Sequence, residues 1–206
     1  MKKKSKRTKK NKRDNDSESD SDCDSDNSIK VSRNHIYFWC DVSKETALDL
    51  TLKINDACHD VRSLTLFGDD PTPVYIHINS YGGDLDAALG VVDTIESLKA
   101  TGATIITIIE GHVASAATLI SVVGTERRIR PNAIMRIHNF STGLFGKKNE
   151  IDEEFANLGQ LENILLDFYK KHTSMNRQQL KRLMARETDL RADDCLAKGL
   201  VDNIQQ

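Results

Sequence analysis

The chain has 206 residues, of which 38% are hydrophobic and 29% are charged, and its formal net charge is −2. This length suffices for one domain with a substantial core, and a charge so close to zero excludes the class of globally basic nucleic-acid-binding proteins. We therefore expect one folded domain at 33–206, preceded by an arm at 1–32.

The charge is segregated within the arm. Residues 1–13 are almost all basic, and residues 14–26 are almost all acidic or serine. Both blocks have almost no apolar residues to offset the entropy of ordering, so we expect the arm to be disordered. Its basic part is a candidate for nuclear targeting or nucleic-acid contact, and its serines are candidates for phosphorylation. The alternative is a solvated appendage without a role.

The compartment is indicated by what the chain lacks. Its basic start is followed by acids instead of an apolar stretch, so we expect no signal peptide, and no stretch reaches the roughly 20 apolar residues of a membrane span. The four cysteines have no CxxC spacing: Cys23, Cys40, Cys58 and Cys195. We expect a cytoplasmic or other reducing intracellular location, and no membrane partner.

Strands and helices alternate up to residue 111. Apolar residues recur at spacings of three and four in the helical segments, and at alternate positions or in β-branched runs in the strands. In chain order we expect a strand at 34–42, a helix at 43–61, a loop at 63–73, a strand at 73–79, a helix at 84–100 and a strand at 103–111. This alternation is typical of an α/β fold with a parallel sheet and right-handed crossovers.

Beyond residue 111 the expected elements are shorter, apart from one long amphipathic helix. They are a short helix at 114–124, strands at 127–131 and 133–138, the long helix at 151–172, a helix at 177–186, and a glycine-capped helical turn followed by a last strand within 193–204.

Three loops are expected to meet at the carboxyl ends of the strands, where open parallel sheets build their sites. They read NSYGGD after the strand at 73–79, GHVAS after the strand at 103–111, and RIHNF at the end of the strand at 133–138. Two glycines before a helix leave amide groups exposed for an anion or oxyanion, although the same pair also makes a plain tight turn.

Ser115 lies between a buried strand and a helix of small residues. It is either filler that lets the helix pack closely, or a nucleophile that needs a base. His138 is the best-placed base, one strand later at the same end, and its alternative is a structural role. His112 is expected to cap its loop or to face the surface. Spacing alone leaves the third, acidic group open among Asp152, Glu153, Glu154, Glu187, Asp189, Asp193 and Asp202.

Four segments, taken in order, resemble the proteolytic subunit of the ATP-dependent Clp protease (ClpP, peptidase family S14), especially its divergent phage-like or virus-like members. They read INSYGGDLDAALGVVDTI, EGHVASAATLI, MRIHNF and DDCLAKGLVDNI. The likeness covers about residues 33–204. It implies a ClpP/crotonase-like superhelix of β-β-α units with a parallel sheet, and a protruding handle of strand and helix at about 140–172.

The resemblance implies a serine endopeptidase that hydrolyses unfolded polypeptides through an acyl-enzyme. Ser115 matches the family's nucleophile and His138 its general base. The backbone amides of Gly83 and Ala116 match the oxyanion hole. No metal site is implied.

The same resemblance selects the acid. Counting back from GLVD puts Glu187 at the family's catalytic aspartate, whereas a shift of one element would select Asp189. Three residues depart from the family's pattern: Tyr81 replaces a proline, Asp84 stands where a small or apolar residue is usual, and Ala116 replaces a methionine. These departures concern substrate preference and the oxyanion loop more than the type of reaction.

The resemblance also implies partners. They are further copies of the chain, in a heptameric ring or double ring, and an AAA+ Clp unfoldase that uses ATP to supply unfolded protein. The chain has no GxxxxGK[ST] motif, so it is not expected to be the ATPase, and we expect no cofactor in it. Its net charge of −2 gives no general indication of nucleic acid, so we expect no nucleic-acid partner for the folded domain.

Two other function classes compete with the peptidase. The first is a catalytically inactive ClpP-like ring subunit with a structural or regulatory role. The second is an acyl-CoA hydratase of the crotonase type, which holds a thioester enolate with backbone amides and needs no pair of serine and histidine.

Overall fold

The computed structural model describes residues 29–65, 72–139 and 145–206. Within these ranges the strands are β1 (Lys30–Ser32), β2 (His35–Phe38), β3 (Val74–Ser80), β4 (Ile105–Ala114), β5 (Glu126–Ile129), β6 (Ile134–Arg136), β7 (Leu190–Arg191) and β8 (Asn203–Ile204). The helices are α1 (Lys44–Thr65), α2 (Leu85–Ala100), α3 (Ala116–Ser121), α4 (Lys148–His172), α5 (Arg177–Met184) and α6 (Ala192–Ala197).

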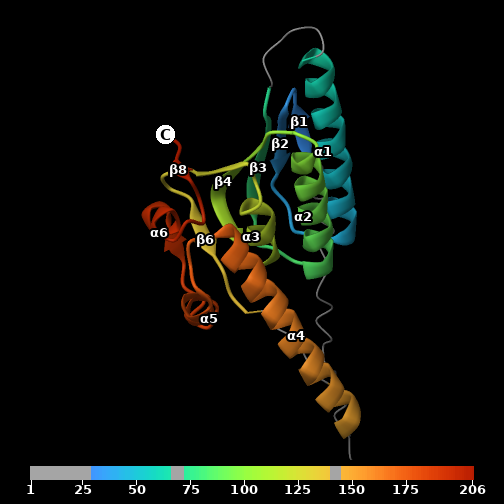
Figure 1. Ribbon diagram of the computed structural model, residues 1–206, viewed down its shortest axis with the longest axis vertical. Helices are drawn as coiled ribbons and strands as arrows, with labels where there is room; N and C mark the ends of the chain where they lie inside the picture. Colours follow the sequence, from blue (N-terminus) through green and yellow to red (C-terminus); the bar gives the residue numbers. More distant parts are fainter. Residues whose placement is uncertain (1–28, 66–71, 140–144) are drawn as a thin grey trace, which may run out of the picture.

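The strands of the described ranges form one mostly parallel sheet in the order β1-β2-β3-β4-β5-β8, with β6 added beside β4 and β7 beside β6. Among the strand pairs of the described residues, β1/β2 and β6/β7 are antiparallel and the others are parallel. Figure 1 shows α1 and α2 side by side against the β1–β3 part of the sheet, and α5 and α6 on the other side of the molecule. The α/β fold class with a mostly parallel sheet is therefore confirmed.

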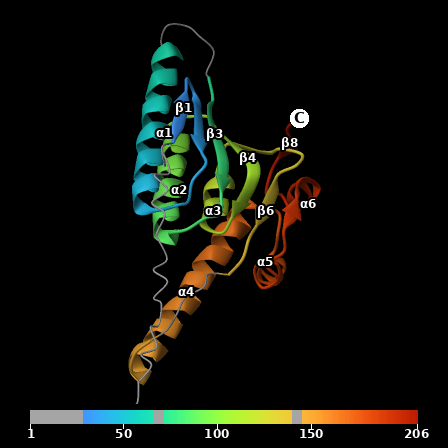
Figure 2. The same cartoon turned by 180° about the vertical axis from the view of Figure 1, so that it is seen from behind.

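One part of the core lies between β3 and the paired helices α1 and α2, which Figure 2 shows from behind, and the same buried cluster continues to α3, α4 and α5. Ile76 and Ile78 of β3 are fully buried, as are Leu50 and Ile54 of α1 and Ile95 of α2. Burial of each such side chain contributes about 1.5–3 kcal/mol. The periodic apolar residues of the sequence thus fix the sheet and helices that position the loops.

Strand β4 changes partner halfway along its length. Its first half pairs with β5, from Ile106 to Ile109, and its second half pairs with β6, from His112 to Ala114. The pairing with β3 shifts register at the same place, between Ile78 and Ser80. The end of β4 therefore leaves β5 and lies beside the strand that leads to residue 138.

Some expected boundaries were wrong. Ile29 is buried, and Lys30–Ser32 pairs with β2, so residues 29–32 belong to the domain and not to the expected arm. Helix α1 continues to Thr65 and β4 continues to Ala114. Both elements extend beyond the last residue of the apolar pattern that predicted them. Strand β7 was not expected, since two residues carry no periodic signal. Residues 1–28 of the arm and residues 140–144 of the handle lie outside the described residues.

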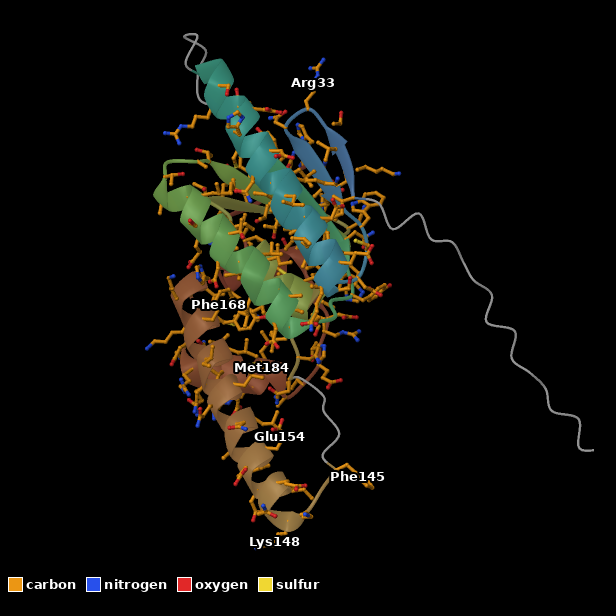
Figure 3. All side chains as sticks on the ribbon, turned by 90° about the vertical axis from the view of Figure 1, so that its right-hand side faces the viewer. Arg33, Phe145, Lys148, Glu154, Phe168 and Met184 are labelled. Carbon is orange, nitrogen blue, oxygen red and sulfur yellow. The ribbon has the colours of Figure 1, made fainter. Side chains whose placement is uncertain are left out.

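Helix α4 has two different halves. Near its C-terminal end Leu165, Leu166 and Tyr169 are buried, whereas Phe155 is 71% exposed. Figure 3 shows Phe168 where the helix meets the body, and Lys148 and Glu154 on the part that extends away from it. Within the described ranges, none of the helices combines the length and the apolar composition that crossing a bilayer requires.

Candidate active site

Ser115 occupies the corner between β4 and α3. Its backbone has φ 53° and ψ −131°, a conformation that costs a non-glycine residue about 1–3 kcal/mol. Hydrogen bonds hold it there: the Ser115 amide donates to the Arg136 carbonyl at 3.0 Å, and the Ser115 carbonyl accepts from the Thr118 amide at 2.9 Å. The Ser115 side chain does not cap α3 and makes no hydrogen bond to a described residue, so its hydroxyl is available to react.

The glycine turn between β3 and α2 lies directly against this corner. A Cβ atom on Gly82, where φ is 100°, would lie 2.6 Å from the Ser115 Cβ and 2.9 Å from the Ala116 nitrogen. A Cβ on Gly83, where φ is 139°, would overlap the Val42 carbonyl. Only glycine fits at either position. The GG pair is therefore required by the close approach of two chain segments, and not only by the tightness of the turn.

Two backbone amides at this contact are free. Neither the Gly83 nor the Ala116 N–H has a hydrogen-bond acceptor within the described part of the chain, and both residues line one pocket with Ser115. The neighbouring Asp84 has a local role, since its carboxylate accepts from the Ala87 amide at 3.0 Å and caps α2. This departure from the family's pattern thus stabilises the start of the helix.

His138 follows β6 and lines the same pocket. Its Nδ1 lies 2.6 Å from the Asn139 carbonyl oxygen. A carbonyl only accepts, so Nδ1 carries the hydrogen, and Nε2 of the neutral ring is left with a lone pair. Nε2 is therefore the nitrogen that can accept a proton. No hydrogen bond joins Ser115 to His138 in the described residues.

The structure does not bring either candidate acid onto His138. Glu187 is exposed and has a strained backbone with φ 49°, but it makes no hydrogen bond to the imidazole. Asp189 accepts from Arg136 Nε at 2.7 Å, and this hydrogen bond holds the pKa of its carboxyl below the usual range. The Asn139 carbonyl occupies the place where an orienting acid would bind the ring.

The environment of His112 differs from the one expected from the sequence. Its side chain is only 19% exposed, and its Nε2 lies 3.7 Å from Asp189 Oδ1. Its ring packs edge-on against the ring of Tyr81, with 5.0 Å between the ring centroids. It therefore packs inward between the glycine turn and the segment of Asp189. Sequence reasoning missed this contact because it depends on the branching of β4, which brings β6 and β7 alongside.

The pocket beside Ser115 has a volume of about 520 Å³. Its apolar lining comes from α2, α3, α4 and α5: Leu85, Leu119, Leu158, Leu161, Leu165, Tyr169 and Met184. Asp84 and Asp86 also line it. Such a lining accommodates an apolar side chain beside the serine. Among the described residues, no cluster of three or more histidine, cysteine, aspartate or glutamate side chains could hold a metal ion.

Fold and site together define a class. A mostly parallel α/β sheet carries a serine on a strained strand-to-helix corner, with a histidine and two free backbone amides around one apolar pocket. This arrangement of residues is the one found in serine peptidases.

Comparison with known proteins gives the family. The sequence model of the Clp protease family ("Clp protease") matches residues 35–206. An ATP-dependent Clp protease proteolytic subunit of Deinococcus radiodurans is 29% identical over 133 residues, which are 64% of this chain and 64% of that protein. A protein of the same description from Mesostigma viride is 30% identical over 138 residues, 66% of this chain and 59% of that protein. The chain belongs to the Clp protease family, and its matches span about three fifths of these relatives' length.

Proposed function

We propose that this chain is the proteolytic subunit of an ATP-dependent chaperone-protease complex, and that it hydrolyses unfolded polypeptides as a serine endopeptidase. One observation carries the proposal: Ser115, on its strained corner, shares a pocket with His138 and with the free amides of Gly83 and Ala116. The family match supports the same reaction class.

The reaction proceeds through an acyl-enzyme. The Ser115 hydroxyl attacks the peptide carbonyl carbon while His138 Nε2 takes its proton, and the amides of Gly83 and Ala116 hold the oxyanion. His138 then gives the proton to the leaving amine as the C–N bond breaks. A water molecule attacks the ester, its proton passes through His138 to Ser115, and the acid product leaves.

Glu187 is the proposed orienting acid. Asp189 is already bound to Arg136, whereas the Glu187 carboxylate has no hydrogen-bond partner among the described residues. In the active arrangement Glu187 replaces the Asn139 carbonyl as the acceptor of the Nδ1–H of His138. Its strained φ supports a functional position, because such backbone conformations concentrate at active sites.

The proposed substrates are polypeptides with an apolar side chain next to the scissile bond, because the pocket lining beside Ser115 is largely apolar. The proposed partners are further copies of the chain in a heptameric ring or double ring, and an AAA+ Clp unfoldase that consumes ATP. Apolar side chains exposed on α4, such as Phe155 and Ile164, support self-association. The reducing intracellular location, the phage-like or virus-like kinship and the role of the arm also stay predictions.

The test compares the wild-type chain with Ser115→Ala in the hydrolysis of an unstructured protein and in labelling by a serine-reactive phosphonate. We expect hydrolysis to fall by about 10³-fold or more and labelling to disappear, because both need the serine oxygen. His138→Ala should also abolish labelling, since it removes the base. Equal hydrolysis by wild type and Ser115→Ala would rule out the assignment.

A catalytically inactive ring subunit is the second candidate, and the Nδ1 contact of His138 with Asn139 is the observation that favours it. In an inactive subunit the Asn139 carbonyl would remain the hydrogen-bond acceptor of His138 Nδ1 at all times. An assembled wild-type sample that fails to react with the phosphonate would support this alternative. Measurable labelling would exclude it.

A further inference from the structure

Two buried hydroxyl groups connect α4 to the carbonyl of the proposed nucleophile. The Thr118 Oγ1 donates to the Ser115 carbonyl oxygen at 2.6 Å, and the Tyr169 hydroxyl lies 2.6 Å from the same Oγ1. Thr118 is fully buried, and Tyr169 is 4% exposed. Water therefore cannot replace either contact without an opening of the site.

The direction of the hydrogen bonds follows from the number of protons. Thr118 has one hydroxyl proton, and the Ser115 carbonyl can only accept, so this proton points to Ser115. The Tyr169 hydroxyl must then donate to Thr118 Oγ1. Burial raises the pKa of Tyr169 well above its usual range, which keeps the donor protonated. The chain of donors runs from Tyr169 through Thr118 to Ser115.

The Ser115 carbonyl belongs to the same peptide plane as the Ala116 N–H. A trans peptide is rigid, and its C=O and N–H point in opposite directions. Anchoring the carbonyl on the Thr118 side therefore fixes the direction of the Ala116 N–H, which is one of the two proposed oxyanion donors. The anchored backbone is also the strained one, with φ 53° at Ser115, so it needs such contacts to persist.

We propose that Tyr169 and Thr118 are positioning residues that aim the Ala116 amide of the oxyanion hole through the Ser115 carbonyl. The inference rests on the proposed peptidase function. The outer part of α4 extends away from the body (Figure 3), and Tyr169 lies near the other end of this helix. Under this proposal α4 also supports the oxyanion hole. The hydroxyl groups act without touching the substrate's reacting atoms.

The first variant is Tyr169→Phe, which removes one oxygen atom and keeps the ring. An oxyanion donor acts mainly in the transition state, so kcat should fall with KM unchanged. We expect a decrease of about 3- to 10-fold, the equivalent of one hydrogen bond and less than the 10²–10³-fold loss of a whole donor. The affinity of a peptide boronate, whose tetrahedral adduct carries an oxygen in the hole, should fall in parallel. Tyr37→Phe is the control, because the Tyr37 hydroxyl has no hydrogen bond to a described residue.

The second variant is Thr118→Val, for which kcat should fall further, by about 10- to 100-fold. This variant leaves the Tyr169 hydroxyl buried without an acceptor, so its Tm should also fall, and Tyr169→Phe added to it should restore part of the Tm. Thr107→Val is the matched control. It removes a buried threonine hydroxyl that donates to the Ser121 carbonyl of α3 at 2.7 Å, and it should lower Tm with kcat unchanged.

Amide hydrogen exchange tests the positioning without reference to activity. Release of the Ser115 carbonyl should speed exchange of the Thr118 amide, which donates to it, in Tyr169→Phe but not in Tyr37→Phe. If the wild type neither hydrolyses peptides nor reacts with phosphonate, the peptidase function fails, and exchange alone decides the positioning. Equal exchange in the two tyrosine variants would overturn the inference, as would a Tyr169→Phe variant that raises KM at unchanged kcat.

Discussion

Ser115 and Glu187 both have a positive φ. In the described ranges Arg33 is the third non-glycine residue with a positive φ. Ser115 and Glu187, unlike Arg33, stand where the family resemblance expects a catalytic group. Strain of this kind persists only where surrounding contacts enforce it. At Ser115 these contacts are the Arg136 carbonyl and the Thr118 amide and hydroxyl.

The choice between two acids is a prediction at this scale. Glu187→Gln should lower kcat by about 10³-fold, because it removes the carboxylate that orients and stabilises the imidazolium. Asp189→Asn should lower kcat by less than about tenfold, since Asp189 pairs with Arg136 and that exposed ion pair contributes little. Steady-state kinetics on one peptide substrate measures both. The reverse order of effects would make Asp189 the acid.

Individual elements are joined by Arg127, at the start of β5. Its side chain donates to the Gly199 carbonyl after α6 at 2.9 Å and to Asp202 Oδ2 at 3.0 Å, and it also reaches the His172 carbonyl at the end of α4. One half-buried guanidinium therefore holds the ends of two helices and the segment before β8. It ties the C-terminal part of the chain to the sheet.

The pH dependence of stability follows from Asp202. The hydrogen bond from Arg127 lowers the pKa of its carboxyl, so the pair stabilises the fold above the unfolded pKa of about 3.9 and loses that effect as pH falls through the folded pKa. Asp202→Asn should cost about 1 kcal/mol at neutral pH, and this cost should shrink as pH falls through the folded pKa of Asp202. Urea unfolding across this range measures the difference. Asp152→Asn is the control, because it removes the exposed Lys148–Asp152 pair of α4 and should change the free energy of unfolding little. An Asp202→Asn effect that does not vary with pH would contradict the assignment.

The described part of the chain forms a sheet-and-helix body from which the outer part of α4 extends (Figure 1). On this helix Phe155 is 71% and Ile164 56% exposed. Single exposed apolar side chains are common on protein surfaces, and these two lie nine residues apart on opposite faces of the helix, so the proposed contact depends mainly on the family match. The proposed partner for the outer part of α4 is a second copy of the chain.

Assembly through α4 predicts different outcomes for its two halves. Phe155→Asp should reduce the assembled fraction in sedimentation velocity with little change in Tm, because the side chain is mostly exposed in the single chain. Leu166→Ala, at a fully buried position near the other end, should cost about 2–5 kcal/mol of folding free energy. An unchanged sedimentation profile for Phe155→Asp would exclude this part of α4 from the interface.

The sequence could indicate the order of elements, because apolar periodicity reflects burial on one face. The alternation that predicted the strand at 73–79 reappears as buried Val74, Ile76 and Ile78. Short strands such as β7 and β1 were not predicted, because two or three residues are too few to show a periodic pattern. The family likeness, and with it Ser115 and His138 as candidates, also came from the linear order of motifs.

Only the tertiary structure could decide what the site residues touch. Asp189 and Glu187 are two residues apart and chemically alike, yet Asp189 accepts a hydrogen bond from Arg136 and Glu187 has no hydrogen-bond partner among the described residues. The hydrogen bonds from Tyr169 through Thr118 to Ser115 span 54 positions of the chain. Periodicity is a property of single elements, whereas such contacts depend on how β4 branches and where α4 packs. The sequence by itself therefore determined most of the elements and the candidate reacting groups, and the packing of elements determined which groups contact them.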